Sequence, residues 1–166
     1  MSLDTAEVQE AVKRSLFTEK HAMDIYRLCA AKMKDERARK SFEVLAEEER
    51  AHAGSFYKIY AGEDIPSLEA YLNTPPTHEG EWLLALNKLV SEDFTEQKAL
   101  ELAMQKEQQL EKALKVQARK VADPEVRAVY EMNVRETHNH YLVIEAEYCR
   151  IMGMVDESDM DTYVRE

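Results

Sequence analysis

Glu49 and His52 are three residues apart in a segment with helical periodicity, so one face of a helix can present both side chains to the same metal ion. Glu19, Glu107 and His140 hold comparable places in three other segments, among apolar residues spaced by three and four positions. A buried ionised carboxylate needs a cation or a metal as its partner. These five side chains therefore predict a metal site inside a helical bundle.

The arrangement matches a di-metal pattern with one change. In di-iron and di-manganese bundles, two helices each supply a glutamate, and the other two each supply a glutamate followed three residues later by a histidine. Thr137 stands where the second such glutamate is expected, three residues before His140. Two other interpretations are open: the glutamates lie on the surface, or the histidines are core residues with hydrogen-bond partners.

Four long helices are expected to position these residues. The connections between the first and second helices, and between the third and fourth, are very short, so each pair should form an antiparallel hairpin. The expected helices run from Asp4 or Thr5 to Met33, from Asp35 to about Gly62, from Thr95 to Val121, and from Asp123 and Pro124 to near Gly153.

A long crossover, residues 62–94, joins the two hairpins. This connectivity predicts an all-α, ferritin-like four-helix bundle that forms a single domain over residues 1–166. Residues 154–166 are a C-terminal tail to which we assign no role. The crossover is expected to cover one flank of the bundle and to contribute to a homodimer interface. Its apolar residues include Trp82, Leu83, Leu84, Leu86, Leu89 and Val90.

The two halves of the chain resemble each other. Glu107 follows Glu19 by 88 residues, and His140 follows His52 by the same interval. The match needs no gap, and residues 32–43 align with residues 120–131. We therefore expect the glutamates and histidines of the two halves to converge at the centre of the bundle.

Composition argues against several classes of protein. A net charge of −11 disfavours nucleic-acid binding through a basic surface. The two cysteines, Cys29 and Cys149, are too few for a four-thiolate centre and are expected to be buried free thiols. The sequence shows neither a signal-peptide pattern nor a long apolar run, so we expect a cytoplasmic protein with no membrane partner.

Two motifs make the chain similar to the rubrerythrin branch of the ferritin-like superfamily. They are Phe42-Glu-Val-Leu-Ala-Glu-Glu-Glu-Arg-Ala-His52 and Asp123-Pro-Glu-Val-Arg-Ala-Val-Tyr130. With Glu19 and Glu107, the resemblance covers about residues 5–150. It implies a di-iron centre that reduces peroxide or oxidises ferrous iron, in a dimer or larger assembly. It also implies these metal ligands: Glu19, Glu49 as the bridge, His52, Glu107 and His140.

The chain departs from the family pattern in three places. It has no Cys-x-x-Cys pairs of a rubredoxin domain, so electrons are expected from a separate donor protein or a small reductant. Thr137 replaces a bridging glutamate, and Leu110 stands where rubrerythrins have an additional one. These replacements predict a centre that is asymmetric, binds one metal more weakly, or lacks redox activity.

Three neighbouring residues have expected roles around the centre. Glu136 is a candidate substitute for the missing ligand, if a π-bulge turns it inward. Tyr26, one heptad after Glu19, is a candidate hydrogen-bond donor to a ligand. Glu48, next to Glu49, is expected on the solvated face of its helix.

Three functions fit these observations. The first is a di-iron oxidoreductase, the second an iron storage, buffering or sensing protein without turnover, and the third a degenerate bundle that serves as an interaction scaffold. Iron is the expected metal, with manganese and zinc as alternatives. Metal content, followed by reactivity with peroxide or oxygen, distinguishes the three.

Overall fold

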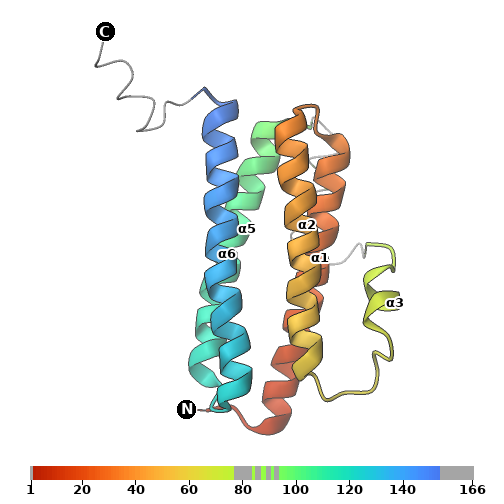
Figure 1. Cartoon of the computed structure of the whole chain (residues 1–166), viewed down its shortest axis with the longest axis vertical. Coiled ribbons are helices and arrows are strands. Elements are labelled where there is room, and N and C mark those ends of the chain that lie inside the picture. The colour runs from red at the N-terminus through yellow and green to blue at the C-terminus, as the bar shows by residue number, and fades with distance from the viewer. Residues whose placement is uncertain (1, 77–83, 85–86, 89–90, 92–93, 154–166) are drawn as a thin grey trace, which may run out of the picture.

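The structure is a computed structural model that describes residues 2–76, 84, 87–88, 91 and 94–153. Four long helices form two hairpins that lie side by side (Figure 1). The hairpins consist of α1 (Thr5–Lys32) with α2 (Glu36–Ile59), and α5 (Glu96–Lys120) with α6 (Pro124–Ile151), while α3 (Leu68–Leu72) is a short helix in the crossover. The all-α bundle predicted from the sequence is confirmed.

The crossover connects opposite ends of the bundle. Helix α2 ends at the end of the molecule where α6 begins, whereas α5 begins at the other end (Figure 1). The chain must therefore return along the length of the bundle between α2 and α5. This long return distinguishes the ferritin-like connectivity from a simple up-and-down bundle.

Capping side chains in the local sequence determine where α1 and α6 begin. The Asp4 side chain accepts a hydrogen bond from the Glu7 amide at 2.9 Å, and the Glu7 side chain accepts one from the Asp4 amide at 2.9 Å. This reciprocal pair satisfies two backbone donors at the start of α1. The Asp123 side chain accepts from the Glu125 and Val126 amides at the start of α6, without a reciprocal bond. Pro124 occupies the first helical position, where its lack of an N–H costs nothing.

Helix α2 ends at Ile59, three residues before the glycine expected to stop it. The Gln9 side chain of α1 donates to the Ile59 carbonyl at 3.2 Å and accepts from the Ala61 amide at 2.7 Å. A residue from the neighbouring helix thus satisfies the last backbone groups of α2. The predicted boundary at Gly62 was wrong because this cap comes from a residue 50 positions away.

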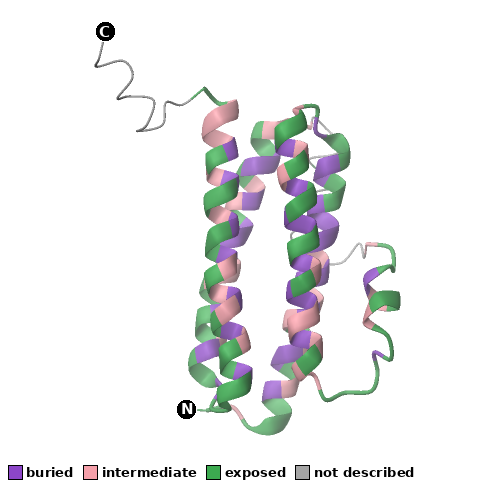
Figure 2. Cartoon of the chain, viewed as in Figure 1, coloured by how far each residue is buried: buried purple, intermediate pink, exposed green. Residues whose placement is uncertain are grey.

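Buried residues line the inner faces of the four long helices (Figure 2). Two aromatic pairs form layers in this core. The rings of Tyr26 and Phe42 have centroids 5.4 Å apart, and those of Phe56 and Tyr130 are 5.1 Å apart. Full burial of an aromatic side chain contributes about 1.5–3 kcal/mol to folding. Polar residues occupy the segment of the core between the two layers.

Helix α3 lies beside the α1–α2 hairpin, away from α5 and α6 (Figure 1). Leu72 is buried, and the Tyr71 ring contacts Phe17 of α1 with centroids 5.5 Å apart. Leu84 of the crossover is 61% exposed. The other crossover residues assigned to a dimer interface (Trp82, Leu83, Leu86, Leu89 and Val90), and the 154–166 tail, lie outside the described residues.

The two cysteines have different surroundings. Cys29 is buried, as predicted, whereas Cys149 is partly exposed. Burial raises the pKa of the Cys29 thiol to about 12, which suits a core residue that remains protonated. Within the described part of the chain, no helix is long and apolar enough to span a membrane.

Candidate metal centre

Five polar side chains meet halfway along the bundle, between the two aromatic layers. Glu19, Glu49 and Glu107 are 0% exposed, and His52 and His140 are 3% exposed. They come from all four long helices: α1, α2, α5 and α6. The convergence expected from the spacing is present, and the alternative of surface glutamates is excluded for these three residues.

Glu49 lies between the two histidines. Its Oε2 atom is 3.1 Å from Nδ1 of His52, and its Oε1 atom is 3.2 Å from Nδ1 of His140. The imidazole rings stack, with centroids 5.0 Å apart and planes at 13°. Ligand atoms of the three residues all lie within 4.8 Å of one another, as required of groups that share a metal ion.

Glu19 and Glu107 each lie beside one histidine of this trio. Oε2 of Glu19 lies 3.8 Å from Nδ1 of His52, and Oε2 of Glu107 lies 4.0 Å from Nδ1 of His140. Each half of the centre therefore contains one histidine and one glutamate of its own. Glu49 is common to both halves, the place expected of a bridging carboxylate.

Several buried oxygen atoms in this cluster have no hydrogen-bond partner among the described residues. They are both carboxylate oxygens of Glu19, Oε2 of Glu107 and the Thr137 hydroxyl. Buried polar atoms in native proteins are nearly always satisfied. Carboxylate and imidazole groups suit iron, manganese and zinc, and bound cations would satisfy these oxygens. The residues present thus fit a metal centre.

The two halves of the centre differ beyond the shared glutamate. The Tyr26 hydroxyl donates a hydrogen bond to Oε1 of Glu107, as expected from the sequence. Lys106 is 4% exposed, and its Nζ lies 3.9 Å from the same carboxylate oxygen and 5.6 Å from the centre of the Tyr26 ring. The burial of Lys106 was not predicted, since a lysine next to Glu107 is ordinarily expected on a solvated face.

The outer nitrogens of the histidines contact two further glutamates. Nε2 of His52 lies 2.5 Å from Oε2 of Glu136, and Nε2 of His140 lies 2.6 Å from Oε2 of Glu48. Such partners fix the orientation and tautomer of an imidazole that binds metal through its other nitrogen. Helix α6 is α-helical throughout, so no π-bulge turns Glu136 inward.

The side chain of Glu48 is 51% exposed, in agreement with its predicted place on a solvated face. Its contact with the buried His140 was not predicted. The internal repeat could have indicated this contact, because Glu136 follows Glu48 by the same 88 residues that separate the two histidines.

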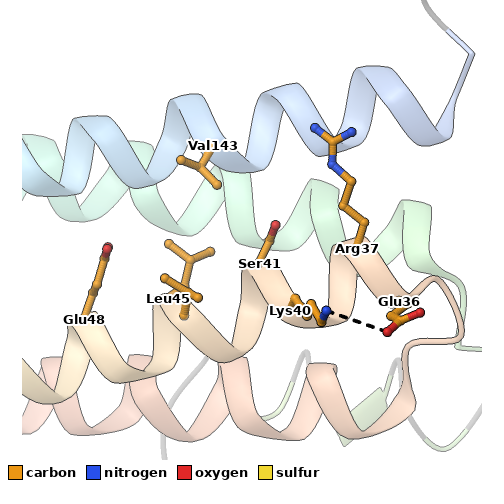
Figure 3. A pocket seen from close by; sticks show the side chains of 8 residues that line it. Glu36, Arg37, Lys40, Ser41, Leu45, Glu48 and Val143 are labelled. Atoms are coloured by element: carbon orange, nitrogen blue, oxygen red, sulfur yellow. Dashed lines mark ion pairs between the residues drawn. The ribbon is translucent and has the colours of Figure 1, made fainter.

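A hollow of about 570 Å³ lies on the α2–α6 face (Figure 3). It extends from Glu36, which pairs with Lys40 at 3.8 Å, to Glu48 on α2, with Val143 of α6 on its wall. None of the five central residues lines it. It approaches the centre only through Glu48, which also contacts His140.

Comparison with known families agrees with this geometry. The family model named Rubrerythrin matches residues 10–148, which is most of the chain and includes all five central residues. The chain belongs to the rubrerythrin family. Searches of curated proteins and of solved structures found no match.

Against the rubrerythrin pattern, the position of Thr137 is the main difference within the core. Thr137 is 0% exposed and stands in the polar layer, so its side chain faces the centre in the way the expected bridging glutamate would. Leu110, the second departure, packs partly buried against the apolar core. The centre of this rubrerythrin therefore has fewer carboxylates than the family pattern.

In the metal-free protein, shifted pKa values of Glu19, Glu49 and His52 reduce the uncompensated negative charge in the centre. Burial and the neighbouring Glu49 raise the pKa of Glu19 well above its usual range. Burial also opposes the charge on Glu49, but contacts with Glu19 and the two histidines lower its pKa overall. Burial opposes a charge on His52, yet Glu19 and Glu49 raise its pKa to about 11. Protons thus hold places that metal ions would take, and metal binding should release them.

The cost of burying a charged Glu19 predicts that Glu19→Gln changes the stability of the metal-free protein. Because burial and the neighbouring Glu49 make the charged form of Glu19 costly, its neutral isostere should raise the free energy of unfolding by roughly 1–3 kcal/mol. Urea denaturation in the presence of a chelator measures the change. Glu43→Gln, at an exposed position of α2, is the control and should leave stability unchanged. A less stable Glu19→Gln protein would mean that the carboxylate is already satisfied.

Proposed function

We propose that this rubrerythrin-family protein is a di-iron oxidoreductase that reduces peroxide. The observation that supports the proposal most directly is the placement of Glu49 against the inner nitrogens of both histidines, at 3.1 and 3.2 Å. In this proposal Glu49 would contribute a carboxylate oxygen to each of two irons. Glu19 and His52 would hold one iron, and Glu107 and His140 would hold the other.

A pair of ferrous ions would supply the two electrons that, together with two protons from solvent, reduce one hydrogen peroxide to two water molecules. The chain provides the surroundings for that chemistry. The aromatic layers of Tyr26 with Phe42 and of Phe56 with Tyr130 separate the centre from bulk water along the bundle axis. The Tyr26 hydroxyl orients the Glu107 carboxylate through its hydrogen bond.

A second candidate function is iron binding without turnover, as in storage, buffering or sensing. Thr137 favours it, because a threonine at the bridging position supplies no negative charge to stabilise an oxidised metal pair. Oxidation of bound ferrous iron, with oxygen or peroxide as oxidant, is common to both candidates. Their difference is whether the centre returns to the reduced state and reacts again.

The proposal includes partners and a cellular location. The two cysteines are too far apart in sequence to form a Cys-x-x-Cys pair, so we propose that electrons come from a separate donor protein. We also propose a homodimer formed through the crossover, to which the exposed Leu84 would contribute. The reducing cytoplasm is the proposed location.

Stopped-flow mixing of anaerobic, ferrous-loaded protein with hydrogen peroxide tests the function. We expect oxidation of two irons per peroxide, followed by repeated turnover when a chemical reductant is present. Oxidation in a single round without turnover would favour the storage or sensing function. A protein that binds no iron would contradict both and leave the scaffold interpretation.

A further inference from the structure

A small hollow of about 260 Å³ opens on the α2–α6 face, immediately outside the two central histidines. We propose that this hollow, here called the histidine port, is the route by which divalent metal ions reach the buried centre. The inference rests on the proposed metal centre and adds where its ions come from. The port is lined by Glu48, Ala51 and His52 of α2 and by Glu136, Asn139 and His140 of α6.

The lining consists of three pairs of equivalent positions. Each residue from α2 has its counterpart on α6 at the 88-residue interval of the internal repeat. The contacts are also reciprocal, since His52 meets Glu136 while His140 meets Glu48. Reciprocal contact of equivalent residues is the mark of an approximate two-fold axis. The port therefore lies on the axis between the two halves and gives both metal positions equivalent access.

The imidazole rings separate the port from the centre. Their outer nitrogens face Glu48 and Glu136, and their inner nitrogens face Glu49. Behind the rings lie the buried oxygens of Glu19 that have no hydrogen-bond partner among the described residues. An ion held by Glu48 and Glu136 is therefore separated from the Glu19 oxygens by the imidazole rings alone. Rotation of one imidazole would let the ion reach them. The larger hollow in Figure 3 shares Glu48 with the port but borders none of the five central residues.

The port also carries the charge needed to collect cations. The side chains of Glu48 and Glu136 are 51% and 46% exposed, so solvent can reach both carboxylates. Two negative groups in one concave site raise the local concentration of cations and their rate of association, and salt weakens this effect. When a metal ion arrives, Glu48 and Glu136 can bind it in place of the histidine nitrogens that they contact in its absence.

Uptake of Co²⁺ by the metal-free full-length chain tests the port, because Co²⁺ absorption reports binding without requiring activity. In the double variant Glu48→Gln with Glu136→Gln, we expect the association rate constant to fall about tenfold or more and to depend less on salt. Saturating occupancy should stay the same, since Gln keeps an acceptor for each histidine. The matched control, Glu43→Gln with Glu131→Gln, removes two equivalent exposed charges from the same helices and should load at the wild-type rate.

A second variant separates access from charge. Ala51→Phe fills the exposed mouth of the port and keeps both carboxylates, so it should also slow loading without changing occupancy. Wild-type rates in both the double variant and Ala51→Phe would overturn the port while leaving the metal centre intact. So would an unchanged association rate with faster Co²⁺ release, which would restrict the two glutamates to holding the histidines. Absence of Co²⁺ uptake by the wild-type protein would overturn the metal centre and the port together.

Discussion

Glu49→Ala should leave the protein almost without metal after anaerobic loading with ferrous iron and removal of excess. Within the part of the chain that the structure describes, Glu49 is the one carboxylate that contacts the inner nitrogens of both histidines, at 3.1 and 3.2 Å. Its loss removes a shared ligand from both sites at once. The affinity should therefore fall by more than the roughly 10–100-fold that loss of a residue supporting a ligand costs. Elemental analysis of iron per chain measures the effect.

Glu43→Ala is the matched control, on the same helix but exposed, and should retain the wild-type iron content. Thermal unfolding provides an independent reading. Metal at about 100 times its dissociation constant stabilises the wild type by about 2.7 kcal/mol, whereas the Glu49→Ala protein should gain almost nothing. If Glu49→Ala retained wild-type iron and the same stabilisation, Glu49 would not be a ligand. Glu49→Gln repeats the test with the side-chain shape preserved.

Thr137→Glu should raise iron occupancy toward two per chain and increase reactivity with peroxide. The new carboxylate would stand at a fully buried position whose hydroxyl has no hydrogen-bond partner among the described residues. It adds a negative charge where an oxidised metal pair most needs one. The same charge has the opposite effect without metal, so we expect the metal-free variant to be less stable by roughly 1–3 kcal/mol. Iron per chain and urea denaturation with chelator measure the two changes.

Thr137→Gln separates charge from size. Gln has nearly the volume of Glu but no charge, so it should not increase iron occupancy. Two further variants test the rival role of Glu136. His140→Ala should lower occupancy, whereas Glu136→Ala should cost less metal, because Glu136 contacts only the outer nitrogen of His52. A Glu136→Ala protein that loses as much iron as His140→Ala would show that Glu136 is a ligand.

The sequence was sufficient to predict the four long helices and the meeting of five polar residues. A bundle buries one stripe of each helix, so a charged residue in that stripe must face the core. Glu19, Glu49 and Glu107 all interrupt apolar stripes at helical spacing, which is why their burial could be predicted. The starts of α1 and α6 were equally predictable, because their caps are made by residues within the same turn.

Features that depend on contacts between helices could not be predicted in this way. Helix α2 ends where Gln9 of α1 caps it, a contact that no local pattern encodes. Glu48 has the spacing of an exposed residue, and only its distance from a histidine on α6 shows its role. Lys106 is buried although its neighbour Glu107 faces the centre, because its ammonium group lies over the Tyr26 ring.

Anomalous diffraction at the iron edge, from crystals of protein purified without a metal-affinity tag and loaded with ferrous iron, tests the central claim most directly. We expect anomalous density inside the bundle, within bonding distance of ligand atoms of Glu49 and of His52 or His140. A second peak, of lower occupancy, should lie beside the first, because Thr137 provides no second bridge. Anomalous density confined to surface carboxylates, or absent from the interior of the bundle, would contradict the proposed metal centre.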